Sequence, residues 1–194
     1  MTHRELVLAS TSLHRAELLR RLGVPFAAET PPDEEHLHSP PCCSPPRIAE
    51  LRARAKAVAV LRRRPAAVVI GCDQVCALGD RLLGKPADAA EAVEQLMSLQ
   101  GAEHMLATAV HVASDGREAS FVDVSRLRMR PLARQEAERY VANDRPVGCA
   151  GGYRIESMGI ALFEDILSAD HTAIVGLPLL RLARELRSFG FSIP

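Results

Sequence analysis

Charged side chains in the stretch IGCDQVCALGDRLLGKP, residues 70–86, are of the types that handle phosphate groups. Asp73 follows an apolar run typical of a strand, and open α/β sheets bind ligands beyond the carboxyl ends of their strands. A carboxylate there either holds a divalent cation or takes a proton from water, and the alternative is an ordinary turn residue. Lys85 precedes Pro86, which suits the first position of a helix, so we expect a cation at a helix N-terminus.

A second cation at a helix N-terminus is predicted near the start of the chain. The apolar run at 5–9 leads through Ser10-Thr11-Ser12 into LHRAELLRRLG, which predicts a strand, a hydroxyl-rich turn and a helix. Arg15 would lie in the first helical turn, where the helix dipole opposes a cation by up to about 1 kcal/mol, so a bound anion explains it better. If Arg15, Asp73 and Lys85 converge, they form a phosphate-handling site, whereas each one alone is also explained by a solvated surface.

Two further groups are weaker candidates. Asp33-Glu34-Glu35 would add carboxylates and Lys56 another cation, but from residue types alone a solvated loop and a solvated helix face explain them better. In AGGYRIE, residues 150–156, the paired glycines would let the backbone approach a ligand, and Glu156 would accept hydrogen bonds from the edge of a base. A plain turn followed by a surface acid is the alternative. The sequence contains no Walker loop, zinc motif or nucleophile elbow.

The elements that would position these residues alternate between strands and helices. Further strands are expected at 66–72, 105–113, 121–129 and 160–166, and further helices at 48–61, 88–99, 132–141 and 177–189. The turns at 79–80 and 114–116 favour hairpins, so the sheet should be mixed, and the proline-rich stretch 29–46 predicts a loop. We therefore expect one α/β domain over residues 1–194, with helices flanking a mixed sheet.

Composition excludes several classes of partner. The 194 residues include 24 basic and 24 acidic side chains, so no overall field favours nucleic acid or an anionic membrane. No apolar stretch approaches the roughly 20 residues of a membrane span, and the start lacks a signal segment, so a cytoplasmic location is expected. The five cysteines are an odd number without zinc spacing, and we assign none of them a role.

Four blocks of the chain resemble, in order and spacing, the signature blocks of the Maf family of nucleoside triphosphate pyrophosphatases. They are LVLASTSLHRAELLRRLGVPF, IGCDQVCALGDRLLGKP, CAGGYRIESMGIALFED and IVGLPLLRLARELRSFG. Within the family, Asp-Gln-Val and the CAGGYRIE segment resemble the 7-methyl-GTP pyrophosphatase branch. The resemblance implies an ITPase-like α/β fold with two lobes around a deep cleft. It also implies hydrolysis of a nucleoside triphosphate to the monophosphate and diphosphate with Mg²⁺ or Mn²⁺, and it leaves a homodimer open.

The resemblance also implies roles for individual residues. Asp73 would be the proton acceptor for water or a metal ligand, with Glu34 as a second metal ligand. Lys56 and Lys85 match charged catalytic positions. The remaining matches bind substrate, with Ser10, Ser12 and Arg15 on the phosphate side and His14, Gln74 and Glu156 selecting the base. His14 stands where the family pattern has a large aromatic residue.

7-Methyl-GTP is the leading substrate on this resemblance. N7-methylation gives guanine a positive charge, so an anionic Glu156 near its edge would favour the methylated base over GTP. Two alternatives stay open: a Maf pyrophosphatase for dTTP or UTP, and a nucleotide-binding regulator of cell division.

Overall fold

The computed structural model describes residues 4–31 and 43–194. The chain divides into two compact units. Unit 1 comprises residues 1–73, 108–123 and 170–194, and unit 2 comprises residues 74–107 and 124–169. The expectation of one domain over residues 1–194 stays a prediction.

The strands form a mixed sheet, as predicted. They are β1 (Leu6–Ala9), β2 (Ala27–Ala28), β3 (Val68–Leu78), β4 (Arg81–Leu83), β5 (Glu103–Ser114), β6 (Arg117–Met129) and β7 (Phe163–Leu167). The seven-stranded sheet has the order β2-β1-β3-β5-β6-β7, and β4 pairs with β3. β1 is parallel to β2 and β3, whereas β3 with β4 and β6 with β7 are antiparallel. The mixed α/β class is therefore confirmed.

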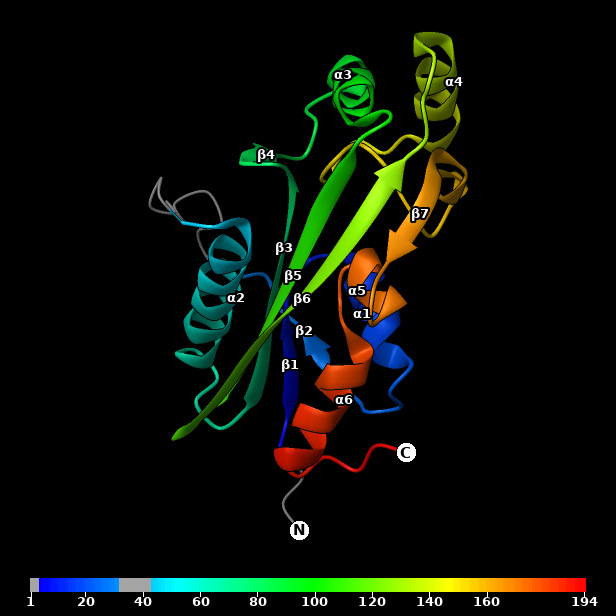
Figure 1. The fold of residues 1–194 in the computed structure, drawn as a ribbon. Helices are drawn as coiled ribbons and strands as arrows, with labels where there is room; N and C mark the ends of the chain where they lie inside the picture. The colour runs from blue at the N-terminus through cyan, green and yellow to red at the C-terminus, as the bar shows by residue number, and fades with distance from the viewer. Residues whose placement is uncertain (1–3, 32–42) are drawn as a thin grey trace. The chain divides into compact units, whose positions relative to one another are not determined.

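Helices flank the sheet (Figure 1). They are α1 (Leu13–Arg20), α2 (Pro45–Leu61), α3 (Ala89–Leu99), α4 (Arg134–Asp144), α5 (His171–Val175) and α6 (Leu179–Ser188), together with a 3-10 helix, η2 (Met158–Leu162). Within residues 4–31 and 43–194, no helix combines the length and the apolar character that a membrane crossing requires.

In unit 1, helices cover both faces of the sheet, with α2 on one face and α1, α5 and α6 on the other (Figure 1). The side chains of β3 contribute alternately to the cores on the two faces of the sheet, because successive side chains of a strand point in opposite directions. Val68, Ile70 and Cys72 join the core that contains α1 and α6, while Val69 packs with Ala57 of α2.

Gly71 sets the distance between α2 and β3. A Cβ atom at this position would lie 2.1 Å from the backbone oxygen of Ala53 and 2.7 Å from the backbone nitrogen of Ala57. Any larger residue would therefore force the helix away from the strand. This close approach brings the side chains of α2 next to the part of β3 that follows Gly71.

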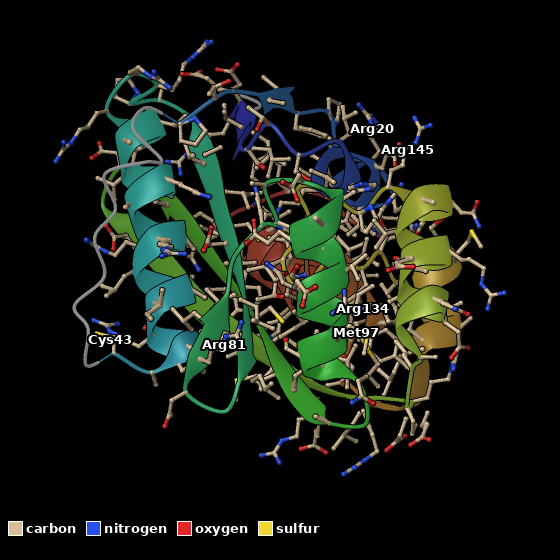
Figure 2. All side chains as sticks on the ribbon, turned by 90° about the horizontal axis from the view of Figure 1, so that it is seen from above. Arg20, Cys43, Arg81, Met97, Arg134 and Arg145 are labelled. Carbon is tan, nitrogen blue, oxygen red and sulfur yellow. The ribbon has the colours of Figure 1, made fainter. Side chains whose placement is uncertain are left out.

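In unit 2, α3 and α4 lie side by side, and Arg134 of α4 forms an ion pair with Glu94 of α3 at 2.7 Å (Figure 2). The carboxylate of Asp88 accepts a hydrogen bond from the backbone N–H of Glu91 at 2.8 Å and so caps α3. The predicted turn at Gly79-Asp80 is present between β3 and β4, and Gly79 has a φ of 57°, which favours glycine.

Two expectations around the predicted site residues are wrong. β3 does not end at Asp73 but continues to Leu78, because the residues after Asp73 are again largely buried and pair with β4. Pro86 is not the first residue of a helix, since α3 begins at Ala89 after its Asp88 cap. Lys85 therefore lies in the connection between β4 and α3, and the N-terminus of that helix is occupied by carboxylates.

Other boundaries also differ from the prediction. The expected strand at 160–166 begins with η2, and only β7 is extended. α2 begins at Pro45 and not at residue 48, because proline is tolerated in the first helical turn. β2 and α5 were not predicted, since two and five residues carry too little periodicity to be recognised.

Candidate active site

The carboxyl end of β1 is the place where the predicted phosphate-site residues of unit 1 gather. Ala9, the last residue of β1, pairs with Gly71 of β3. Ser10 and Asp73 follow these two residues, so both lie just beyond the end of the parallel pair. This is the position at which open α/β sheets bind ligands, and it agrees with the prediction for Asp73 although β3 itself continues.

Asp73 forms a buried ion pair with Lys56 of α2. The Nζ atom of Lys56 lies 2.8 Å from Oδ1 of Asp73, and the two side chains are 8% and 12% exposed. Arg52, one turn earlier on α2, has a guanidinium nitrogen 3.9 Å from Oδ2. The interpretation of Lys56 as part of a solvated helix face is therefore wrong, because the contact of α2 with Gly71 places this lysine inside the unit.

The hydroxyl-rich turn caps α1 as predicted. The Oγ atom of Ser12 accepts a hydrogen bond from the backbone N–H of Arg15 at 3.4 Å. The Oγ atom of Ser10 accepts one from the backbone N–H of Ser12 at 3.2 Å and one from the Arg15 guanidinium at 3.5 Å. The two serines thus connect the end of β1 with the side chain of Arg15.

The Arg15 guanidinium is held by backbone carbonyls. Its Nε donates to the oxygen of Gly176 and its Nη1 donates to the oxygen of Cys72, each at 3.1 Å. These contacts give a structural reason for a cation in the first turn of α1 that the sequence argument for a bound anion did not consider. A guanidinium has five N–H donors, so fixing it through two carbonyls still leaves donors for an oxyanion.

Cys72 lies at the centre of these charges. Burial raises the pKa of its thiol, Arg15 lowers it, Asp73 raises it and Lys56 lowers it, with burial the largest effect. Its Sγ donates to the oxygen of Gly176 at 3.1 Å, so the thiol is a hydrogen-bond donor and not a nucleophile. Arg15 bonds to the carbonyl of Cys72 and Lys56 bonds to the next residue, Asp73, so the three charged residues lie around one short segment of β3.

Gly71 and Gly176 are the positions at this site that the sequence analysis missed. An isolated glycine in an apolar strand is a signal for close backbone approach, and Gly71 carried that signal. Gly176 ends α5 with a φ of 126°, and its carbonyl accepts from both Arg15 and Cys72. Nothing local in the sequence links Gly176 to Arg15.

Predicted residues of unit 2 form a second group around Cys149. Burial raises the pKa of this thiol, Glu156 raises it further, and Arg154 and Lys85 lower it. Lys85 is exposed, and Glu156 forms an ion pair with Arg154 at 3.4 Å. Lys85 and Glu156 are thus close enough to one group to act on it together.

The other predicted residues lie on β3, on α1 and outside the described residues. Gln74 follows Asp73 within β3, and strand alternation directs its side chain to the opposite face of the strand. His14 is half-buried in the first turn of α1. Glu34 lies outside the described residues.

The chemistry of Asp73 fits the implied divalent cation. Its Oδ2 atom is buried and has no hydrogen-bond partner among the described residues, so one hard oxygen ligand is available. Mg²⁺ is commonly bound through one or two carboxylates together with substrate phosphates. Within the described part of the chain, no group of three or more His, Cys, Asp or Glu side chains is arranged as a metal site.

The sequence is similar to those of known proteins over nearly the whole chain. The family model for the Maf-like protein matches residues 5–189. A protein of Bdellovibrio bacteriovorus is 41% identical over 188 residues, 97% of this chain and 98% of its own length, and one of Xanthomonas campestris pv. campestris is 44% identical over 190 residues with the same shares. A protein of Aromatoleum aromaticum is 42% identical over 197 residues and covers both chains fully. All three relatives bear the name 7-methyl-GTP pyrophosphatase.

Proposed function

The chain belongs to the Maf family, and on this premise we propose that it hydrolyses 7-methyl-GTP to 7-methyl-GMP and diphosphate. The observation that carries the proposal is its full-length identity of 41–44% to relatives named for this activity. The buried Lys56–Asp73 pair beside Arg15 supports it, because it supplies a carboxylate and cations at one site.

In the proposed reaction, the oxygen of water attacks the α-phosphorus, the bond from that phosphorus to the bridging oxygen breaks, and diphosphate departs. Asp73 orients the water and accepts its proton at the carboxylate. Lys56 stabilises the ionised carboxylate before the attack, since a lone buried charge would be costly. A divalent cation, when bound with Asp73 and Glu34 as ligands, would neutralise charge on the phosphate oxygens.

Arg15 would bind the phosphate chain through the donors that its carbonyl contacts leave available. Because Gly176 and Cys72 already fix the guanidinium, it needs little reorganisation when negative charge develops on the phosphate oxygens. Ser10 and Ser12 would add hydroxyl and backbone donors on the same side. Lys85 as a further phosphate cation and a deep cleft between two lobes stay predictions.

Base selection is assigned to Glu156, with His14 and Gln74 as further proposed contacts. The Glu156 side chain is 26% exposed, so its carboxylate is accessible to a ligand while it is still held by the protein. A carboxylate at the edge of a cationic 7-methylguanine gains an attraction that neutral guanine lacks.

A nucleotide panel tests the proposal. Purified protein is incubated with 7-methyl-GTP, GTP, dTTP and UTP, with Mg²⁺, with Mn²⁺ or with a chelator, and diphosphate release is measured. We expect the highest kcat/KM for 7-methyl-GTP and loss of release with the chelator. Faster hydrolysis of dTTP or UTP would mean that this nucleotide, and not 7-methyl-GTP, is the preferred substrate. Nucleotide binding without any diphosphate release would contradict the proposal that the protein is an enzyme.

A further inference from the structure

Two polar residues near the C-terminal end of α4 are buried and contact the segment that carries Glu156. Tyr140 and Asp144 lie one turn apart on this helix, and each is only 6% exposed. Neither residue belongs to the blocks that suggested the function. The phenolic oxygen of Tyr140 and one carboxylate oxygen of Asp144 nevertheless accept hydrogen bonds from the segment between Arg154 and Ser157.

Two hydrogen bonds, one from a backbone N–H and one from a side-chain hydroxyl, tie the segment on either side of Glu156 to α4. The backbone N–H of Arg154 donates to the phenolic oxygen of Tyr140 at 2.9 Å. The hydroxyl of Ser157 donates to Oδ1 of Asp144 at 2.5 Å. Glu156 is the residue immediately before Ser157, so the four-residue stretch that contains it is held by a buried acceptor at each end, through the backbone of Arg154 and the side chain of Ser157.

A third set of contacts reaches the Glu156 carboxylate itself. The Arg154 guanidinium donates through Nη1 to the backbone oxygen of Asp144 and through Nε to Oε1 of Glu156, each at 3.4 Å. A cation at the last carbonyls of a helix is favoured by the helix dipole. Arg154 therefore links the end of α4 to the carboxylate, and a shift of either partner would move the carboxylate.

The surroundings keep the Tyr140 phenol protonated. Burial raises its pKa well above the usual range, and the neighbouring Asp144 carboxylate raises it further. The neutral phenolic oxygen accepts the N–H of Arg154, so this anchor does not depend on a charge on Tyr140.

We infer that Tyr140 and Asp144 are positioning residues for Glu156, and that through Glu156 they determine the preference of the enzyme for a cationic purine base. This inference rests on the proposed function. Discrimination by a single carboxylate depends on its distance from the charged base, because the attraction falls steeply when the group moves into water. The α4 anchor supplies that fixed position.

The test removes single anchors while it keeps the packing. Tyr140→Phe retains the buried ring and removes the oxygen that accepts the Arg154 N–H, and Ser157→Ala removes the bond to Asp144. For each variant we expect the KM for 7-methyl-GTP to rise and kcat to stay within about twofold, so that the kcat/KM ratio of 7-methyl-GTP to GTP falls roughly three- to tenfold. Thermal unfolding verifies that each variant is folded.

The matched control is Ser125→Ala. Ser125 is buried in the same unit, and its hydroxyl is bonded at 2.8 Å to Ser168, a residue outside the segment 154–157. This variant loses a comparable hydroxyl bond, so an equal fall in the substrate ratio would show a general effect of destabilising unit 2. That result would overturn the inference.

A double-mutant cycle with Glu156→Gln shows whether the anchors act through Glu156. In the Glu156→Gln background we expect Tyr140→Phe to leave the substrate ratio unchanged, because the carboxylate that it positions is gone. An equal loss in both backgrounds, or an unchanged ratio in both single variants, would overturn the positioning role. A wild-type protein without preference for 7-methyl-GTP would instead contradict the proposed function, and the inference with it.

Discussion

Asp73 carries an ion pair on one carboxylate oxygen and, within the part of the chain that the structure describes, an unsatisfied acceptor on the other. One oxygen is bound to Lys56, and the other is buried without a hydrogen-bond partner among the described residues. A structural ion pair normally satisfies both oxygens, because an unsatisfied buried acceptor costs about 1–3 kcal/mol. An oxygen kept in this state is suited to a water molecule or a metal ion that arrives with the substrate.

Replacement of Asp73 by asparagine separates its chemistry from its structural role. The amide keeps an oxygen that accepts from Lys56, but it can neither take a proton from water nor offer a charged oxygen to a metal. We expect Asp73→Asn to lower kcat for diphosphate release by about 10²- to 10⁴-fold, with a circular dichroism spectrum like that of the wild type.

Asp80→Asn is the matched control for this variant. Asp80 is an exposed residue of the hairpin turn between β3 and β4, so the same chemical change there should leave kcat unchanged. Undiminished turnover by Asp73→Asn would remove Asp73 from the proposed mechanism.

At the scale of elements, the contact of α2 with β3 brings Lys56 to Asp73. Helix and strand approach until the backbone of Ala53 and Ala57 touches Gly71, and the lysine side chain follows on the same face of the helix. The ion pair therefore depends on the glycine. Gly71 permits the close approach of α2 to β3, and this approach brings Lys56 within reach of Asp73.

Gly71→Ala should disrupt both parts of this feature. A methyl group 2.1 Å from the Ala53 oxygen must displace α2, since the obstructing atom is backbone. We expect the free energy of unfolding to fall by about 1–3 kcal/mol or more and kcat to fall with it, because Lys56 moves with the helix. Chemical denaturation and diphosphate release measure the two effects.

Gly84→Ala is the matched control for stability. A Cβ atom at Gly84 would meet no atom within 4 Å, and its φ lies outside the region that favours glycine. An equal loss of stability in both variants would contradict the steric explanation for Gly71.

At the scale of the whole molecule, stability should depend on pH through a buried histidine. His104 is 2% exposed, its Nε2 lies 2.8 Å from the hydroxyl of Tyr153, and burial lowers its pKa to about 4. The unfolded chain takes up this proton near a pH of about 6.5, but the folded chain does so only at a much lower pH. The contribution of His104 to stability is therefore fully present above the pKa of histidine in the unfolded chain, and it is lost as the pH falls toward 4.

We expect the free energy of unfolding to decrease between pH 6.5 and 4 with a share from His104 of up to about 1.4 kcal/mol per pH unit. His104→Gln removes this share, so its stability should vary less with pH than that of the wild type over the same range. Urea denaturation at several pH values measures both slopes. Equal slopes for the two proteins would mean that another group causes the pH dependence of stability. His111 is one such group, because burial also lowers its pKa.

Much of the secondary structure could be predicted because its signals are local. The apolar run before Ser10, the capping hydroxyl of Ser12 and the turn at Gly79-Asp80 each determine one element through neighbouring residues. Predictions were wrong where a local signal is compatible with two structures. Pro86 suits the first position of a helix, but here it lies in the connection before Asp88, the residue that caps α3. Predictions were also wrong where Asp73 interrupted a strand that pairing with β4 continues.

The sequence by itself determined the class of fold and the family resemblance, and it indicated the charged residues that we propose for the phosphate site. Only the tertiary structure decided which of them meet. Lys56 and Asp73 are 17 positions apart, and Arg15 and Gly176 are 161 positions apart. Local propensity acts over a few residues, whereas a buried charge pair forms only when packing excludes water around both partners. For that reason Lys56 has the sequence pattern of a surface lysine but the environment of a buried ion pair.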